Sequence, residues 1–511
     1  MDSSLLQDIV IVGGGSAGWL TAGVLAADHG DRLRITLIES PDVAPIGVGE
    51  GTWPSMRDTL RRIGVLESDF MRDCDAAFKQ GSRFDGWVDG SAADRYHHPF
   101  SLPQGFGDTD LVAHWQRHHA DVPFADLVTY QTHLCEAGRA PKQAATPQFA
   151  AVANYGYHLD AGKFGTFLKA HCLEKLGVRY ISDHVVGVDS SDNGDIAALR
   201  TGSHGLLPAD LFIDCSGMKS LLLGGHFGVP LVAQQHVLFN DRALAVQLPY
   251  RQPDDPIAST TMSTAQRAGW IWDIGLPTRR GIGHVYSSAH CGDDEAEAAL
   301  RAYIGASSGQ HDIPAPRQIR FAPGYRERFW QRNCVAVGLA SGFIEPLEAS
   351  ALALVEMAAI AISDALPFER AAMDIVARRF NADFTYRWER VIEFLKLHYV
   401  LSRRQGDFWR DHRAAASMPP RLQELLRLWR RRAPARGDFA STNEVIPAAS
   451  YQYILYGMGF SGTATAHLQD DGELADRSFR EAASLTARML PALPDNRSLL
   501  AHIARHGLPS I

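Results

Sequence analysis

The segment near the amino terminus constrains the fold more than any other part of this sequence. Residues 9–12 read as a strand, residues 13–18 as a glycine turn, residues 19–28 as a helix and residues 33–39 as a second strand. The turn has the pattern Gly-x-Gly-x-x-Gly, whose glycines let the backbone approach a pyrophosphate at the positive end of the helix. A carboxylate that ends the second strand is expected to bind the ribose hydroxyls of the same dinucleotide. The residues expected to contact this cofactor are Gly13, Gly15, Ser16, Ala17, Gly18 and Glu39.

Two later segments favour FAD over NAD as the dinucleotide. Residues 211–217 and 335–340 resemble the second and third flavin-contacting turns of hydroxylase-like flavoproteins, with Asp214 and Gly338 at the turns. No second Gly-x-Gly-x-x-Gly follows a strand, so the sequence offers no NADPH site. We therefore expect the flavin to arrive reduced, as FADH2 supplied by a separate flavin reductase.

Composition excludes several classes of protein. A net charge of −8 over 511 residues argues against a nucleic-acid partner held by bulk electrostatics. No apolar run approaches the ~20 residues of a membrane span, and the strand that begins at Asp8 leaves no room for a signal peptide. Six scattered cysteines without Cys-x-x-Cys spacing indicate reduced thiols and no metal site. We expect a cytoplasmic protein with no nucleic-acid or membrane partner.

Two further motifs narrow the class of flavoprotein. Residues 270–274 read Trp-Ile-Trp-Asp-Ile, and Lys79 stands in the segment Asp-Ala-Ala-Phe-Lys-Gln-Gly at residues 75–81. Both resemble the flavin-dependent tryptophan halogenases, whose Trp-x-Trp-x-Ile-Pro element is absent from the single-component flavin hydroxylases. The resemblance runs through ordered motifs from Asp8 to Phe460.

The resemblance implies the chemistry of the site. In this family reduced FAD, oxygen and halide give hypohalous acid, which reaches a lysine beside the aromatic substrate, and Lys79 matches that lysine. Its amine either hydrogen-bonds the acid or forms a haloamine, as a buried lysine can. Glu348 matches the glutamate that orients the lysine and takes the ring proton, with Glu345 the close alternative. The backbone N–H groups of Ser350 and Ala351, at the start of a helix, are expected to hold the halide.

The sequence departs from the family pattern in two places. Glu348 is followed by Ala-Ser-Ala, where the family usually has Ser-Thr-Gly or Ser-Thr-Ser. Ala349 therefore removes a hydroxyl that can assist the lysine or the oxidant. Gly275 stands where the tryptophan element usually has proline. These departures leave the halide preference and the turnover open.

A glycine-rich loop at residues 47–54 completes the expected flavin side of the site. It reads Gly-Val-Gly-Glu-Gly-Thr-Trp-Pro and resembles the family's loop that couples the flavin and substrate regions. Its glycines suit a backbone that approaches a ring or changes conformation, and Gly49 is expected to contact the flavin.

Three side chains are expected to contact the substrate. His98 matches a substrate-side histidine of the family, although His97 leaves the register open and a structural histidine fits equally well. Residues 451–460 resemble the segment that closes the substrate pocket. Tyr453 and Tyr456 would stack on an indole there, although core packing explains these aromatic residues nearly as well.

The order of the strand and helix patterns predicts an α/β protein. We expect a Rossmann-like FAD-binding domain of the flavin hydroxylase type, with a β-sheet substrate region and a helical carboxy-terminal part. This domain is expected to span residues 1–400, with an irregular, pocket-shaping insertion at residues 82–148 and a helix at residues 348–365. Residues 401–511 are expected to form a helical subdomain that closes the substrate pocket.

These observations predict a halogenase that uses FADH2, oxygen and chloride or bromide on an electron-rich aromatic, tryptophan or another indole. Its expected partners are the flavin reductase and the small aromatic substrate, and a homodimer is left open. One alternative is a flavin-dependent aromatic monooxygenase, against which Lys79 and the paired tryptophans count. The other is an FAD-binding protein that has lost halogenation, which the altered motif at residues 348–351 suggests.

Overall fold

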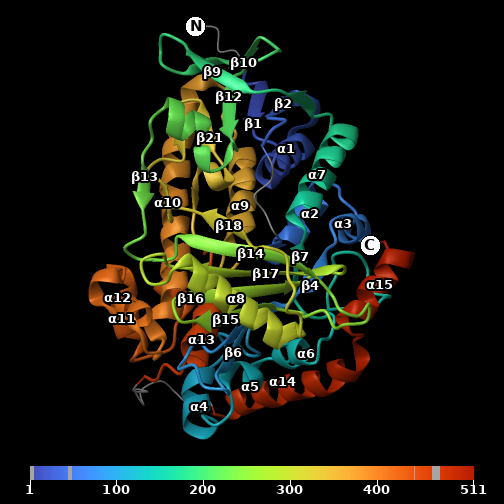
Figure 1. Ribbon diagram of the computed structural model, residues 1–511, viewed down its shortest axis with the longest axis vertical. Coiled ribbons are helices and arrows are strands. Elements are labelled where there is room, and N and C mark those ends of the chain that lie inside the picture. The colour runs from blue at the N-terminus through green and yellow to red at the C-terminus, as the bar shows by residue number, and fades with distance from the viewer. Residues whose placement is uncertain (1–4, 44–48, 442, 463–471, 511) are drawn as a thin grey trace. The chain divides into compact units, whose positions relative to one another are not determined.

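The amino-terminal segment folds as the βαβ unit that its sequence predicts (Figure 1). The computed structural model describes residues 5–43, 49–441, 443–462 and 472–510. Strand β1 (Asp8–Val12) lies parallel to β2 (Arg34–Glu39), and α1 (Ser16–His29) connects them. The helix begins earlier than expected: Gly15 is its N-cap and Ser16 is its first residue.

Residue contacts divide the chain into two units, and the chain passes between them several times. The first unit holds residues 1–76, 159–234 and 322–389, and the second holds residues 77–158, 235–321 and 390–511. Helix α10 (Arg370–Leu401) contributes residues to both units. The division expected after residue 400 stays a prediction.

The first unit combines parallel and antiparallel strands with helices. Its helices are α1, α2 (Met56–Arg62), α3 (Glu67–Asp73), α7 (Ala161–Lys175) and α9 (Ser350–Asp364). Its other strands are β3 (Glu50–Gly51), β8 (Arg179–Ser182), β9 (Val185–Ser190), β10 (Ile196–Thr201), β11 (Leu206–Pro208), β12 (Leu211–Asp214), β13 (Leu231–Ala233), β19 (Gly324–Arg326), β20 (Trp330–Gln331), β21 (Cys334–Ala336) and β22 (Gly342–Phe343).

A six-stranded sheet in the order β20-β21-β12-β1-β2-β8 organises the first unit. All neighbouring pairs in it are parallel except β20 and β21. Helix α1 packs against α7 and α9, and apolar residues of β1, β12 and β21 share one buried core. Because parallel strands end at the same edge of a sheet, the turns after β1, β12 and β21 lie at one edge, where such folds bind their cofactors.

The second unit contains a mainly antiparallel sheet and most of the carboxy-terminal helices. Its strands are β4 (Ala77–Lys79), β5 (Gly81–Asp85), β6 (Arg95–Pro99), β7 (Gly156–Leu159), β14 (Arg242–Pro249), β15 (Thr261–Gln266), β16 (Gly269–Gly275), β17 (Arg279–Tyr286) and β18 (Arg317–Arg320). Its helices are α4 (Leu111–His118), α5 (Phe124–Val128), α6 (Gln131–Glu136), α8 (Asp293–Ser308), α11 (Asp407–Arg413), α12 (Pro420–Trp429), α13 (Ala448–Gly457), α14 (Gly472–Ala492) and α15 (Asn496–His506).

Seven strands form the main sheet of the second unit, in the order β18-β14-β17-β16-β15-β5-β6. Only the pair of β15 and β5 is parallel among them. The segment 82–148 is more regular than expected, because it supplies β6, most of β5, and helices α4 to α6. Aromatic residues pack together beside this sheet: Phe84, Trp87, Tyr96, Trp270, Tyr399 and Trp409.

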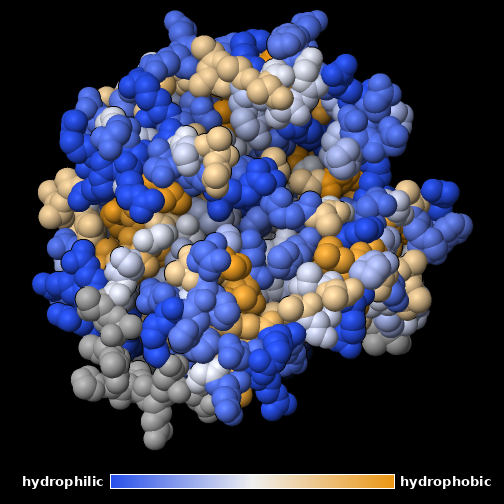
Figure 2. All heavy atoms as spheres, turned by 90° about the horizontal axis from the view of Figure 1, so that it is seen from below, coloured by the Kyte–Doolittle hydropathy of each residue, from blue (hydrophilic) through white to orange (hydrophobic). Residues whose placement is uncertain are grey.

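The large apolar side chains of the described residues are mostly buried in these cores. On the face drawn in Figure 2, hydrophilic residues cover most of the surface and hydrophobic residues form separate patches. Among the described helices, none combines the length and apolar character that a membrane span requires.

Candidate active site

The glycine turn after β1 approaches the turn after β12 too closely for a side chain at Gly13. Gly13 has a φ of 117°, and a Cβ there would lie 2.2 Å from the carbonyl oxygen of Cys215. A Cβ on Gly18 would lie 1.9 Å from the carbonyl oxygen of Gly13. At Gly15, by contrast, a Cβ would meet no heavy atom of the described residues within 4 Å. The turn is therefore tight on its protein side and open at Gly15, as a pyrophosphate cradle requires.

The first turn of α1 lies against the turn that follows β21. Ser16, Ala17 and Gly18 form the start of the helix, where backbone N–H groups have no partner within the helix and favour an anion. Gly338 has a φ of 68°, and a Cβ there would lie 2.7 Å from the Cβ of Ala17. The structure thus brings together two turns that the sequence assigned to one cofactor.

Glu39 is oriented by two polar side chains at the end of β2. Its Oε2 accepts hydrogen bonds from Lys169 Nζ and from the Tyr180 hydroxyl, each at 3.0 Å. A Cβ on Gly14 would lie 2.2 Å from the carboxyl carbon of Glu39, so this glycine leaves room for the carboxylate. The carboxylate therefore lies beside the glycine turn, as expected for a group that binds ribose hydroxyls.

Asp214 organises the turn that follows β12. Its fully buried carboxylate accepts hydrogen bonds from the backbone N–H groups of Leu222 and Leu223, both at 2.9 Å, and from the Ser216 hydroxyl. The sequence predicted that Asp214 contacts the flavin directly. These bonds indicate that it also holds the shape of the turn, and the direct contact stays a prediction.

The loop at residues 49–54 is fastened to the segment that carries Glu348. The indole N–H of Trp53 donates to the backbone carbonyl of Glu348 at 2.7 Å. Gly49 has a φ of 138°, a conformation that favours glycine, whereas residues 47–48 of the motif lie outside the described residues. Burial raises the pKa of Glu50 to about 7. The loop and Glu348 therefore form one connected part of the first unit.

Glu348 lies in a turn and not in the helix that the sequence predicted. Helix α9 begins at Ser350, because Ala349 has a φ of 54°, a left-handed conformation that is strained for a residue with a side chain. Glu345 and Glu348 are both buried, at 1% and 5% exposure, so burial does not separate the two candidates. Ser350 and Ala351 open the helix, and their N–H groups are at its positive end.

Replacing Trp53 with phenylalanine is expected to lower the halogenation rate about tenfold, because the lost bond is worth about 1 kcal/mol and Glu348 loses its anchor. Flavin binding should be retained. The control is Trp330→Phe, which removes a similar indole bond to the backbone carbonyl of Arg332. Steady-state kinetics per bound flavin would check this, and equal effects of the two variants would contradict it.

A second buried glutamate connects α9 to α2. Glu356 Oε2 accepts a hydrogen bond from the Thr59 hydroxyl at 2.6 Å, and Oε1 accepts one from the Ser55 hydroxyl at 3.3 Å. Burial raises the pKa of Glu356 to about 8, although both hydroxyls act in the opposite direction. In the unfolded chain a glutamate titrates near ~4.3. Between these two values the folded protein holds a proton that the unfolded chain releases, so stability falls as the pH rises.

Glu356→Gln is expected to remove this pH dependence, because glutamine stays neutral. The free energy of unfolding of the variant, relative to that of the native chain, should therefore be about 4 kcal/mol higher at pH 8.5 than at pH 5. Denaturant unfolding at the two pH values measures the difference. A difference that does not change with pH would show that Glu356 is ionised in the folded protein.

In the second unit, Lys79 lies on a short buried strand. Strand β4 pairs antiparallel with β7, which places Lys79 opposite Gly156. The side chain is 1% exposed, and its Nζ lies 5.5 Å from the centroid of the Phe100 ring. Lysines are almost never buried this fully unless they are paired or functional. The observed burial is therefore what a catalytic lysine in an enclosed site requires.

His158 is a neighbour of Lys79 that the sequence reasoning missed. It lies on β7 opposite Ala77, so its side chain and that of Lys79 are on the same face of the two strands. Its Nε2 and the Thr261 hydroxyl form a hydrogen bond of 2.8 Å. Burial and the nearby charge of Lys79 hold the pKa of His158 well below its usual value. A neutral imidazole therefore lies beside the lysine. In the sequence, the only sign of His158 as a site residue is that it is a histidine within a strand pattern.

The structure resolves the register of the two histidines on β6. His98 Nε2 lies 2.9 Å from the Ser450 hydroxyl, and its ring centroid lies 6.2 Å from that of Tyr453. His97 faces the other way, and its Nε2 lies 2.9 Å from Glu136 Oε1. His98 is therefore the histidine of the two that lies with the tyrosine segment, and its contact with substrate stays a prediction.

Tyr453 and Tyr456 belong to an aromatic cluster in α13 and its neighbours. The Tyr453 hydroxyl donates to the backbone carbonyl of Ser101 at 2.9 Å. Phe124 packs against both tyrosines, with ring centroids 6.1 and 5.2 Å away, and Trp115 packs against Tyr456 at 5.6 Å. Both tyrosines are buried, so core packing accounts for much of their environment. Direct substrate stacking by either ring stays a prediction.

The paired tryptophans occupy alternate positions on β16, as expected. Trp270 is fully buried and packs against Trp87, at 6.5 Å between ring centroids. The ring of Trp272 lies over Gly283 on β17, where a Cβ would come within 2.1 Å of it. The pair therefore shapes the core of the sheet, and any further role is not visible in its contacts.

The structure therefore assembles the predicted residues in two groups. One group contains the glycine turns, Glu39, Glu348 and the start of α9 in the first unit, and the other contains Lys79, His98 and the tyrosines in the second. Lys79 and Glu348 belong to different units, so their pairing stays a prediction.

Three adjacent parallel strands end in turns at one edge of the sheet, and Glu39 lies beside the first of these turns. This arrangement is typical of a dinucleotide-binding α/β fold of the flavoprotein class. The family model named tryptophan halogenase matches residues 8–472. The chain thus belongs to the tryptophan halogenase family, and the predicted α/β fold with its Rossmann-like FAD-binding part is confirmed.

Several relatives match almost the whole chain. The 7-chloro-L-tryptophan 6-halogenase of Kutzneria sp. is 33% identical over 97% of this chain and 99% of its own length. The crystal structure of a tryptophan halogenase from Shewanella frigidimarina has a TM-score of 0.97 and 50% identity, with full coverage of both chains. A flavin-dependent halogenase from Brevundimonas sp. has a TM-score of 0.86 and 33% identity, over 98% of this chain and 99% of its own. The chain is a flavin-dependent halogenase, and the hydroxylase alternative is not favoured.

Proposed function

We propose that this enzyme installs chlorine or bromine on tryptophan or another indole, and that a separate flavin reductase supplies its reduced FAD. The observation that carries this proposal is the almost complete burial of Lys79 on β4, in a setting that matches the family lysine. Two of the relatives described above carry a substrate in their names, and both are tryptophan halogenases. Their names support an indole substrate.

The residues of the first unit suit FAD. The open face at Gly15 and the N–H groups of Ser16 to Gly18 would hold the pyrophosphate, and Glu39 would hold the adenosine ribose. Gly49, the Asp214 turn and Gly338 would border the flavin ring. When bound in reduced form, FAD would supply the oxidation of halide by oxygen to hypohalous acid. The N–H groups of Ser350 and Ala351 would hold the halide, a task that needs the backbone and not a side-chain hydroxyl.

Lys79 and Glu348 then have separate roles. Lys79 holds hypohalous acid by a hydrogen bond to its oxygen, or carries the halogen as a haloamine with loss of water. As the ring carbon forms its bond to the halogen, the bond from halogen to oxygen, or to nitrogen in the haloamine, breaks. The released hydroxide or amine takes up a proton. Glu348 accepts the proton that the ring carbon loses, which restores aromaticity.

A mass-spectrometric assay would test this function. The purified enzyme is incubated with FAD, a flavin reductase, NADH and a panel of indoles, with chloride, with bromide and with neither. The expected product carries the halogen isotope pattern and forms only when halide is present. Incorporation of one oxygen regardless of halide would contradict the proposal.

A further inference from the structure

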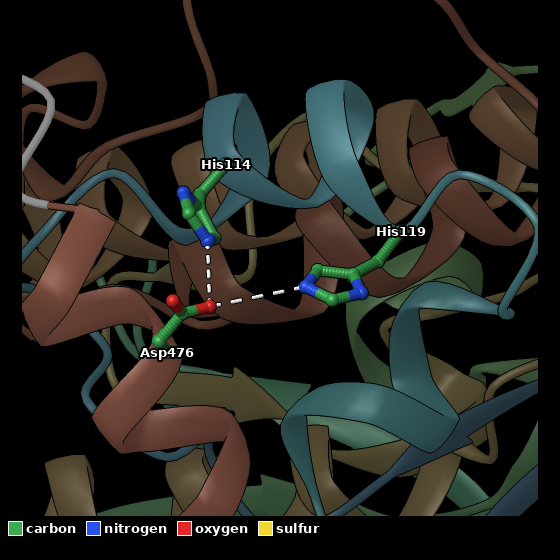
Figure 3. A group of neighbouring side chains, drawn as sticks. All are labelled: His114, His119 and Asp476. Carbon is green, nitrogen blue, oxygen red and sulfur yellow. Dashed lines mark hydrogen bonds and ion pairs between the residues drawn. The ribbon is translucent and has the colours of Figure 1, made fainter.

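Two histidines and an aspartate from distant parts of the second unit meet at one place (Figure 3). His114 lies on α4, His119 directly follows this helix, and Asp476 lies near the start of α14. The Nε2 of His114 donates to Asp476 Oδ1 at 2.8 Å, and the Nε2 of His119 lies 3.8 Å from the same oxygen. The three ligand atoms all lie within 4.8 Å of one another.

This donor set suits a zinc ion. Zinc binds imidazole nitrogen and carboxylate oxygen at about 2.0–2.2 Å, which places the ligand atoms of a tetrahedral site about 3.3–3.6 Å apart. The separations to Asp476 of 2.8 and 3.8 Å fall on either side of that range. The side chains of His119 and Asp476 are 37% and 45% exposed, so they have room to rotate into place. Three protein ligands would leave the fourth position to water.

Phe479 packs against both histidine rings. The centroid of the Phe479 ring lies 5.8 Å from that of His114 and 5.6 Å from that of His119. Phe479 belongs to the same helix as Asp476, so one helix supplies both a ligand and an aromatic ring beside the other two.

The simpler interpretation is a hydrogen bond that joins two helices. The bond between His114 and Asp476 would be sufficient for that role. His119 is not needed for it, yet its Nε2 is directed toward the same carboxylate oxygen (Figure 3). A second imidazole at this position is what distinguishes a metal site from a helix contact.

We propose that His114, His119 and Asp476 form a binding site for a divalent zinc ion that fastens the start of α14 to α4. On zinc binding, the proton on Nε2 of His114 moves to Nδ1, since the ligand nitrogen must be unprotonated. Trp115, the residue after His114, packs against Tyr456 and Phe124. Zinc therefore stabilises the helices around the tyrosine segment of α13.

Titration calorimetry with zinc chloride on chelator-treated full-length protein tests this site. We expect one zinc ion per chain to bind through it, with a Kd of about 1 μM or lower. His119→Ala and Asp476→Asn should each weaken that binding at least about tenfold. The control is the double variant His502→Ala/His506→Ala. It removes another pair of histidines, on α15, whose ring centroids lie 4.8 Å apart. Its zinc binding at the proposed site should be unchanged.

Thermal unfolding separates a zinc site from a helix contact. At a zinc concentration near the native Kd, zinc should raise the melting temperature of the native chain and that of His119→Ala much less. Co²⁺ in place of zinc should give the visible absorption of a tetrahedral site, and His119→Ala should lose it. The proposal is overturned if no zinc binds, if His119→Ala binds zinc like the native chain, or if only the double variant on α15 loses it.

Discussion

Lys79→Met is expected to abolish halogenation, with a loss of product formation of at least about 10³-fold. Methionine is similar in length to lysine and is apolar, so it should fill the buried position on β4 without the amine. In the proposed mechanism, the oxidation of halide uses residues of the first unit. Flavin binding and oxygen consumption should therefore continue while the halogenated product disappears. Product and oxygen are measured in the same reaction, per bound flavin.

A matched control exists within the second unit. Lys142 is fully buried like Lys79, and its Nζ donates to the Tyr155 hydroxyl at 3.1 Å and to the Pro147 carbonyl at 3.2 Å. Lys142→Met therefore removes a buried ammonium with the same substitution at another place. Its folded fraction should retain halogenation. If both variants lose activity equally, the loss reports the removal of a buried charge and not a role for Lys79.

Glu348→Gln is expected to lower the halogenation rate about 10²- to 10⁴-fold, the usual contribution of a general base. Glutamine keeps the size and the backbone bond to Trp53 but cannot accept the ring proton. Substrate binding should change little, so the effect should appear in kcat and not in KM. Steady-state kinetics with a fixed supply of reduced flavin would measure both constants.

Glu345→Gln is the comparison for this prediction, because Glu345 is also buried and precedes Glu348 closely in the sequence. A small effect at Glu345 with a large one at Glu348 supports the assignment. The opposite pattern would transfer the base to Glu345. If neither variant slows the reaction, the ring proton is lost to another acceptor.

The flavin side of the site could be predicted from the sequence because its signals are local. The glycine turn, Glu39 and the strands before Asp214 and Gly338 are short patterns, and parallel pairing places their ends at one edge. The start of α9 could not be predicted, because a helical pattern does not show that Ala349 adopts a left-handed conformation. The helix therefore begins after Glu348 and not at it.

The second unit was less predictable, since contacts between distant segments build it. His158 is a neighbour of Lys79 only through the pairing of β4 with β7, and no local pattern shows that pairing. The same holds for Asp476, which meets His114 and His119 only because α14 packs against α4. The sequence predicted no metal site, because its cysteines lack the spacing of one and Asp476 is far in the chain from the two histidines.

A single-turnover reaction with bromide tests the role of Lys79 most directly. Reduced FAD is mixed with one equivalent of enzyme, oxygen, bromide, an accepted indole and a small-molecule scavenger of hypobromous acid, and both brominated products are quantified. The native enzyme should brominate the indole, whereas Lys79→Met should brominate only the scavenger. If the variant brominates the indole as the native enzyme does, Lys79 does not deliver the halogen.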